Sequence, residues 1–141
     1  MHSVNPNEAL LKHLKDISLK NNIKIFAGTA FKYQSPEPNP AKAALLAQDY
    51  GLIATSSGSG TGHAADLTKI KSMSRAVNGH LALASGLTIN NLADYHPYVE
   101  FALVATGISQ NEHYFDSKKL VAFIDKAQEL NSKKHVLIAE E

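Results

Sequence analysis

Short apolar runs alternate with amphipathic segments along most of the chain, and this alternation predicts the secondary structure. In residues 6–22, leucine and isoleucine recur at helical spacing with lysines between them, which predicts a helix with one apolar face. Residues 23–30 are largely apolar, which is typical of a strand buried on both faces. The same two patterns then alternate to residue 130. The predicted strands are 23–30, 52–56, 81–84 and 101–106, and the predicted helices are 6–22, 41–50, 67–77, 88–96 and 117–130.

Strict alternation of strand and helix favours an α/β fold with a parallel sheet and right-handed crossovers. Two architectures fit this order. One is half of a (βα)8 TIM barrel with four strands, and the other is an open α/β sandwich of three layers. The 141 residues suit a single domain covering residues 1–141. A last apolar segment, 135–139, would either pair as an edge strand or cover part of the core, and the pattern does not decide between them.

Polar residues stand at the expected starts of four helices. Asn39, Asp66, Thr88 and Asp116 each precede a helical segment, where a side-chain oxygen can accept a hydrogen bond from an amide of the first turn. Gly51 follows the segment 41–50 and is expected to end that helix.

Two consecutive predicted strands end in a glycine beside a hydroxyl residue. Ser85 and Gly86 follow the run 81–84 and precede Thr88, while Gly107 and Ser109 follow the next strand. A strand that enters a helix through glycine leaves backbone N–H groups pointing into a concavity that favours anions, above all phosphate. The alternative is ordinary turn chemistry, with glycine for a left-handed turn and threonine for a helix cap.

The loop 57–62 is rich in glycine and offers a second candidate for phosphate binding. Gly58, Gly60 and Gly62 alternate with hydroxyl residues in this loop, which could cradle a phosphate or cover a ligand. No lysine follows at the spacing of a P-loop, so that motif is excluded. The alternative is a flexible surface loop without a ligand.

Lys32 and His63 are the candidate catalytic residues. Lys32 follows the first strand, at the sheet edge where barrel enzymes place their chemistry, and it could pair with a phosphate or a carboxylate. His63 adjoins the glycine-rich loop and could act as an acid or a base. The alternatives are a solvated lysine and a solvent-facing histidine. Asp66 fits a helix cap better than a catalytic base.

Composition narrows the possible functions. The net charge is +1 and the basic residues form no block, which argues against a nucleic-acid partner. The chain has no cysteine, which excludes disulfides and thiol catalysis, and its histidines lack the spacing of a metal site. No cofactor motif is present. No signal peptide is visible and the apolar runs are too short to span a bilayer, so a cytoplasmic location is expected.

Four segments together resemble BtpA-family proteins, also described as SgcQ-like or photosystem I biogenesis-like. They are Ile23-Lys-Ile-Phe-Ala, the glycine-rich run 51–62, the run Ala84-Ser-Gly-Leu-Thr-Ile-Asn-Asn91, and the helix that Asp116 precedes. The resemblance spans about residues 7–130, and the motifs come in the family's order. It implies a TIM barrel of which this chain holds the strands equivalent to five to eight.

The chain departs from the family pattern at two strand ends. Lys32-Tyr33 stands where relatives tend to have Lys-His, which removes an imidazole from that position. The last strand ends in Ala105-Thr-Gly-Ile-Ser109 where relatives often show Val-Gly-Ser, so its glycine, Gly107, is kept.

The resemblance also implies that the barrel is incomplete, because a closed (βα)8 barrel takes about 250 residues. Four parallel strands cannot close, and their two outer strands and inner surface would be left uncovered. We therefore expect a homodimer or a partner chain that completes the barrel. The leading functional hypothesis is binding of a phosphorylated small molecule, a sugar phosphate or a nucleotide, with or without catalysis. The alternatives are a non-enzymatic assembly protein and a truncated fragment of a larger barrel enzyme.

Overall fold

The computed structural model describes residues 6–32, 37–58, 63–111 and 113–140. Four parallel strands form one sheet in the order β1-β2-β3-β4, as the alternating pattern predicts. The strands are β1 (Phe26–Gly28), β2 (Ile53–Ser56), β3 (Leu81–Ala84) and β4 (Phe101–Leu103). The helices are α1 (Pro6–Asn21), α2 (Pro40–Asp49), α3 (Leu67–Ala76), α4 (Leu92–Tyr95) and α5 (Ser117–Glu140), with 3-10 turns η1 (His96–Tyr98) and η2 (Thr106–Ile108).

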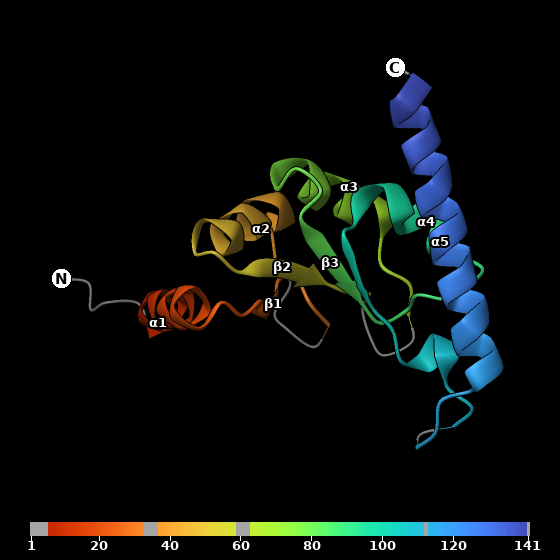
Figure 1. Cartoon of the computed structure of the whole chain (residues 1–141). Helices are drawn as coiled ribbons and strands as arrows, with labels where there is room; N and C mark the ends of the chain where they lie inside the picture. Colours follow the sequence, from red (N-terminus) through yellow and green to blue (C-terminus); the bar gives the residue numbers. More distant parts are fainter. Residues whose placement is uncertain (1–5, 33–36, 59–62, 112, 141) are drawn as a thin grey trace.

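The helices of this fold lie to one side of the sheet. Figure 1 shows α2, α3 and α4 over the same face, with α1 beyond the edge at β1 and α5 beyond the edge at β4. Sequential strand order produces this result, because successive right-handed crossovers that step in one direction place their helices on one side. A three-layer sandwich needs helices on both faces, so the described elements follow the order of half a barrel instead.

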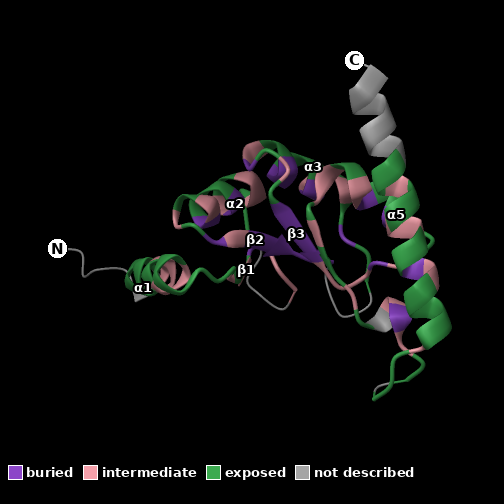
Figure 2. Ribbon diagram, in the orientation of Figure 1, coloured by how far each residue is buried: buried purple, intermediate pink, exposed green. Residues whose placement is uncertain are grey.

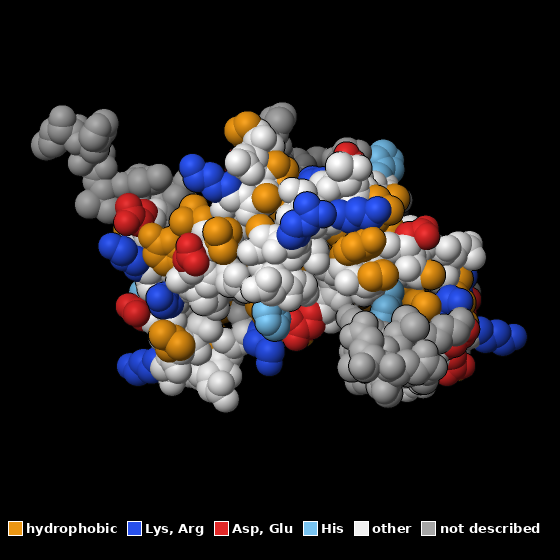
Figure 3. Space-filling model, turned by 90° about the horizontal axis from the view of Figure 1, so that it is seen from above, with side chains coloured by type: hydrophobic (Ala, Val, Ile, Leu, Met, Phe, Trp, Pro, Cys, Tyr) orange, Lys and Arg blue, Asp and Glu red, His pale blue; other side chains and the backbone are white. Residues whose placement is uncertain are grey.

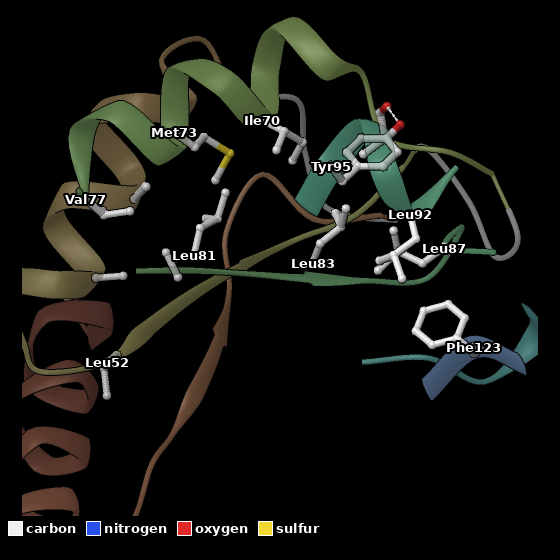
Figure 4. Packing of buried hydrophobic residues seen from close by; sticks show 14 of the residues in the cluster. Leu52, Ile70, Met73, Val77, Leu81, Leu83, Leu87, Leu92, Tyr95 and Phe123 are labelled. Atoms are coloured by element: carbon white, nitrogen blue, oxygen red, sulfur yellow. Dashed lines mark hydrogen bonds between the residues drawn. The ribbon is translucent and has the colours of Figure 1, made fainter. Parts of the chain in front are cut away.

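The hydrophobic core lies between the sheet and its helices. Leu81 and Leu83 of β3 are fully buried and point toward Ile70 and Met73 of α3 (Figure 4). Burying an aliphatic side chain of this size contributes roughly 1.5–3 kcal/mol. Figure 2 shows that burial is concentrated in β2, β3 and the inner sides of α2 and α3, whereas α1 and α5 are largely exposed. The centre of the sheet therefore contributes most to the core.

The other face of the sheet, which we call the open face, has no described helix over it. Strand register places partner residues on the same face, so Phe26 and Ile53 lie together, as do Thr55, Ala82 and Phe101. Side chains alternate along a strand, so Leu103 shares this face with Phe101. Phe26 and Leu103 remain 38% and 42% exposed. The open face is thus an apolar surface at the two outer strands.

Three of the four predicted helix caps are confirmed. The Oδ1 atoms of Asn39, Asp66 and Asp116 accept hydrogen bonds from amides of the first turns of α2, α3 and α5, at 2.9 to 3.1 Å. Gly51 ends α2 with φ of +70°, as predicted.

Thr88 is not the cap that the sequence suggested, because α4 begins at Leu92 and Asn91 precedes it. The carboxamide of Asn91 accepts from the Thr88 amide at 2.8 Å and donates to the Gly86 carbonyl at 2.8 Å. Asn91 therefore closes a turn where a helix was predicted, and it shortens that helix.

The apolar segment 135–139 belongs to α5, which runs to Glu140. The alternative in which this segment pairs as an edge strand is therefore wrong. The physical reason lies in the sequence, since neither glycine nor proline interrupts residues 117–140 and a helix can continue through them.

Candidate functional site

A cavity of about 490 Å³ opens where the carboxyl ends of β3 and β4 meet the segment that follows β1. Among the residues that sequence analysis selected, Lys32 and Ser85 line it, although they are 53 positions apart in the chain. The other walls are apolar, from Ala84, Ala102, Leu103, Val104 and Ala105. The fold therefore brings one cation and one hydroxyl residue to a mostly apolar cavity at the end of the strands.

Lys32 is held at this cavity by its main chain. Its amide donates to Ser57 Oγ at 2.8 Å, which fixes the segment after β1 against the end of β2. Its Nζ lies 5.8 Å from the centroid of the Phe31 ring, within the range of a cation–π contact. Lys32, a half-buried residue of the cavity wall, is therefore anchored through its main chain.

Ser85 has a strained backbone. Its φ is +71°, in the left-handed region that serine seldom adopts, and Gly86 follows with φ of +78°. The Ser85 amide donates to the Leu103 carbonyl at 3.3 Å, which continues the pairing of β3 with β4 past the strand end. Strain of this kind costs on the order of 1–3 kcal/mol and is found preferentially at ligand sites.

Three of the predicted phosphate-binding glycines allow loops to pack closely together. A Cβ added at Gly58 or Gly86 would lie 2.0 or 2.2 Å from the carbonyl oxygen of His63. A Cβ at Gly107 would lie 2.2 Å from the carbonyl oxygen of Leu87. Glycine is needed at these positions because neighbouring main chain occupies the space. None of the three is among the described residues that line the 490 Å³ cavity.

The remaining predicted residues lie around this packing. Ser109 Oγ donates to the Ala105 carbonyl at 2.5 Å, and the Ser109 carbonyl accepts from Lys119 Nζ at 3.3 Å. His63 is exposed, and its main chain packs against the two glycines. Gly60 and Gly62 lie outside the described residues. The structure thus brings Lys32 and Ser85 to one cavity and does not add His63, Thr88 or Ser109 to its walls.

Lys69 is a residue that sequence reasoning missed. Its Nζ donates to the carbonyls of Ala30 at 3.0 Å and Ser57 at 2.7 Å, so it joins the ends of β1 and β2. Ser56 Oγ also donates to the Ala30 carbonyl, at 3.1 Å. Burial lowers the pKa of Lys69, and the nearby Asp66 carboxylate opposes that shift. No sequence signal separates this lysine from Lys71 on the same helix.

Other classes of site find no support in the part of the chain that is described. No three His, Asp or Glu side chains there are placed to hold a metal ion. No helix among the described residues is both long and apolar enough to cross a bilayer. Figure 3 shows basic, acidic and apolar side chains intermixed on the face seen from above. That mixture fits the low net charge, and this face lacks the single-sign field of a nucleic-acid interface.

No protein-family model, curated protein or solved structure matches the chain.

Proposed function

We propose that this chain binds a phosphorylated small molecule, a sugar phosphate or a nucleotide, in the cavity between Lys32 and the carboxyl ends of β3 and β4. The observation that carries the proposal is the convergence of Lys32 and Ser85 on one 490 Å³ cavity. Its volume lies within the range of about 300–1,000 Å³ that is usual for ligand sites. The Lys32 ammonium supplies the positive charge that a phosphate requires.

Different residues of the cavity wall would contact different parts of the ligand. Ala84, Ala102 and Leu103 offer apolar surface on which the carbon skeleton of a sugar or the face of a base can pack. Ser85 supplies a hydroxyl beside the phosphate. The left-handed φ of Ser85 also supports a binding role. Glycine would adopt this φ without strain, so a serine at this position carries a conformational cost that a binding role for its side chain would explain.

The place of the cavity in the fold also supports this function. Parallel α/β sheets bind ligands at the carboxyl ends of their strands, and (βα)8 barrels commonly hold phosphate near the last two. The relationship to the BtpA family belongs to the same proposal, and the sequential order of the four parallel strands supports it. Roles of Lys32 and His63 in catalysis stay predictions. Lys32 borders the cavity, whereas His63 is exposed outside its described walls.

Thermal-shift measurements test the proposal. Inorganic phosphate, ribose 5-phosphate and adenosine monophosphate are compared with ribose and adenosine, which lack the phosphate. At ten times the dissociation constant, a bound ligand stabilises the folded chain by about 1.4 kcal/mol. We expect a rise in melting temperature with at least one phosphorylated compound and none with its unphosphorylated counterpart.

Charge variants assign the response to the cavity. Lys32→Met should remove the shift, whereas Lys42→Met, at an exposed position of α2, should keep it. A shift that survives Lys32→Met unchanged, or no shift with any of the phosphorylated compounds, would overturn the proposed function.

A further inference from the structure

Among the described residues, the two outer strands of the sheet each have one edge without a neighbouring strand. β1 and β4 each pair with one neighbour within the described residues, so each has an edge along which another parallel strand can add. Phe26 on β1 and Leu103 on β4 expose apolar surface on the open face beside those edges. Thr55 and Ala82 at the centre of this face are buried, so its exposed apolar surface lies beside the two edges, where a partner that pairs with both edges would cover it.

The exposed surface is larger than a compact chain of this size presents. The solvent-accessible area is 9437 Å², whereas a compact monomer of 15.2 kDa exposes about 7,100 Å². Among the described residues, α1 and α5 are largely exposed and project from the sheet (Figures 1 and 2). A surplus of this size on each of two chains matches the area that obligate dimers bury, about 2,000–5,000 Å² in total.

The two end helices carry apolar residues beyond those that pack on the core. On α1, Leu10 is 54% exposed, and on α5, Val121 and Ile124 are 56% and 45% exposed. Leu10 and Val121 each stand four residues after the first residue of their helix. α1 lies beside the β1 edge and α5 beside the β4 edge, so these exposed apolar side chains belong to helices at opposite edges of the sheet (Figure 1).

We infer that the partner is a second copy of this chain, and that two copies close into an eight-stranded parallel barrel about a twofold axis. The axis runs along the strands, so β4 of each copy lies parallel to β1 of the other and both open edges are paired. Eight is the strand number at which a (βα)8 barrel closes around an interior filled by side chains. The open faces become that interior, and α1 of each copy packs against α5 of the other.

This inference does not depend on phosphate binding, but it predicts that the second copy contributes to the walls of the cavity. Lys32 and Ser85 of both copies would stand around one mouth of the barrel, and the edge of the second copy would form part of the wall of each cavity. A binding site completed by two chains should lose its ligand response when the dimer is broken.

Sedimentation equilibrium of the full chain, from micromolar to submillimolar concentration, measures the assembly. We expect a mass twice the 15.2 kDa of one chain. Phe26→Asp places a carboxylate on the open face and should lower the apparent association constant at least tenfold. The matched control is Leu45→Asp on α2, because Leu45 is 42% exposed but lies on the helical side. A monomer at all concentrations, or a dimer unaffected by Phe26→Asp, would overturn the inference.

Cross-linking tests the arrangement even if Phe26→Asp fails to fold. The chain has no cysteine, so single cysteines report specific contacts. Chains carrying Leu10→Cys and chains carrying Val121→Cys are coexpressed and treated with a short bismaleimide. We expect a cross-linked dimer from the mixture, little from either variant alone, and little from Leu45→Cys mixed with Val121→Cys. Cross-links from the single variants but none from the mixture would contradict the twofold barrel.

Discussion

The phenyl rings of Phe26 and Phe101 meet edge to face across the open face of the sheet, with centroids 5.4 Å apart and planes at 87°. They come from the first and last strands, which are separated by β2 and β3. Between them on this face lie the smaller side chains Thr55 and Ala82. Two large rings at the outer strands and small residues at the centre make the open face concave, as the inner wall of a barrel must be.

The contact between these rings should contribute to stability beyond the area that each ring buries. Aromatic pairs in this geometry are worth about 0.5–1.5 kcal/mol. We expect Phe26→Leu and Phe101→Leu to be non-additive by that amount in the free energy of unfolding, measured with urea at one fixed protein concentration. Phe26→Leu combined with Phe115→Leu is the control, because Phe115 is 63% exposed and lies outside the sheet. Additive effects in the first pair would mean that the rings do not interact.

Glycine at position 86 should be required for close packing as well as for its backbone angle. Gly79 has φ of +82° with open space around a hypothetical Cβ, so Gly79→Ala should cost only the left-handed strain, about 1–2 kcal/mol. Gly86 has φ of +78°, and a Cβ there would collide with the His63 carbonyl. We expect Gly86→Ala to cost more than about 3 kcal/mol in chemical unfolding. Equal losses in the two variants would show that the loops can separate without penalty.

Lys69 should stabilise the ends of β1 and β2. Lys69→Met removes the donor to the carbonyls of Ala30 and of the buried Ser57, and the loss is costly because a buried carbonyl without a hydrogen-bond donor is unfavourable. We expect a loss of about 1–3 kcal/mol in the free energy of unfolding. Lys71→Met, on the exposed side of the same helix, should cost less than about 1 kcal/mol, since it loses only a contact with the Tyr98 ring. Similar losses for both variants would argue against a structural role for Lys69.

Tyr95 should make the fold sensitive to alkaline pH. Its buried hydroxyl donates to the Ala65 carbonyl at 2.5 Å. Burial raises the pKa of Tyr95 above its usual 10.0, with smaller contributions from the Asp94 and Asp66 carboxylates. Below pH 10.0 the phenol is protonated in both states and its contribution is complete. As the pH rises above that value the unfolded tyrosine ionises first, so stability is lost.

Tyr95→Phe isolates this effect. At neutral pH we expect the variant to be less stable by about 0.5–1.5 kcal/mol, because it lacks the hydrogen bond. The difference between the two proteins should shrink as the pH passes above 10.0, which urea unfolding at neutral and at alkaline pH can measure. A constant difference over that range would show that Tyr95 does not titrate with unfolding.

The fold was predictable because its signals are local. Alternating apolar runs located all four strands, and the caps at Asn39, Asp66 and Asp116 located three helix starts. The sequence signals failed at Asn91, whose side chain bonds to the main chain three and five residues earlier. The two hydrogen bonds of Asn91 replace the first turn of a predicted helix, and nothing in the local pattern separates a turn-closing asparagine from a helical one.

The candidate site was predictable only in part. Strand ends indicated Lys32 and Ser85, but no sequence feature gave the path of the main chain at His63 that packs against Gly58 and Gly86. A glycine near a strand end has the same sequence appearance whether it faces a ligand or a neighbouring loop. Lys69 was missed for a related reason, because its function depends on two carbonyls that only the tertiary structure brings together.

Amide chemical shifts during a titration with inorganic phosphate test the central claim most directly, since they locate the bound anion residue by residue. We expect the largest changes at Ser85 and at residues 102–105, together with the amide of Lys32, and saturation at one site. The same changes should be absent in Lys32→Met. Shifts confined to other surfaces, or none at saturating phosphate, would contradict the assignment of an anion site to this cavity.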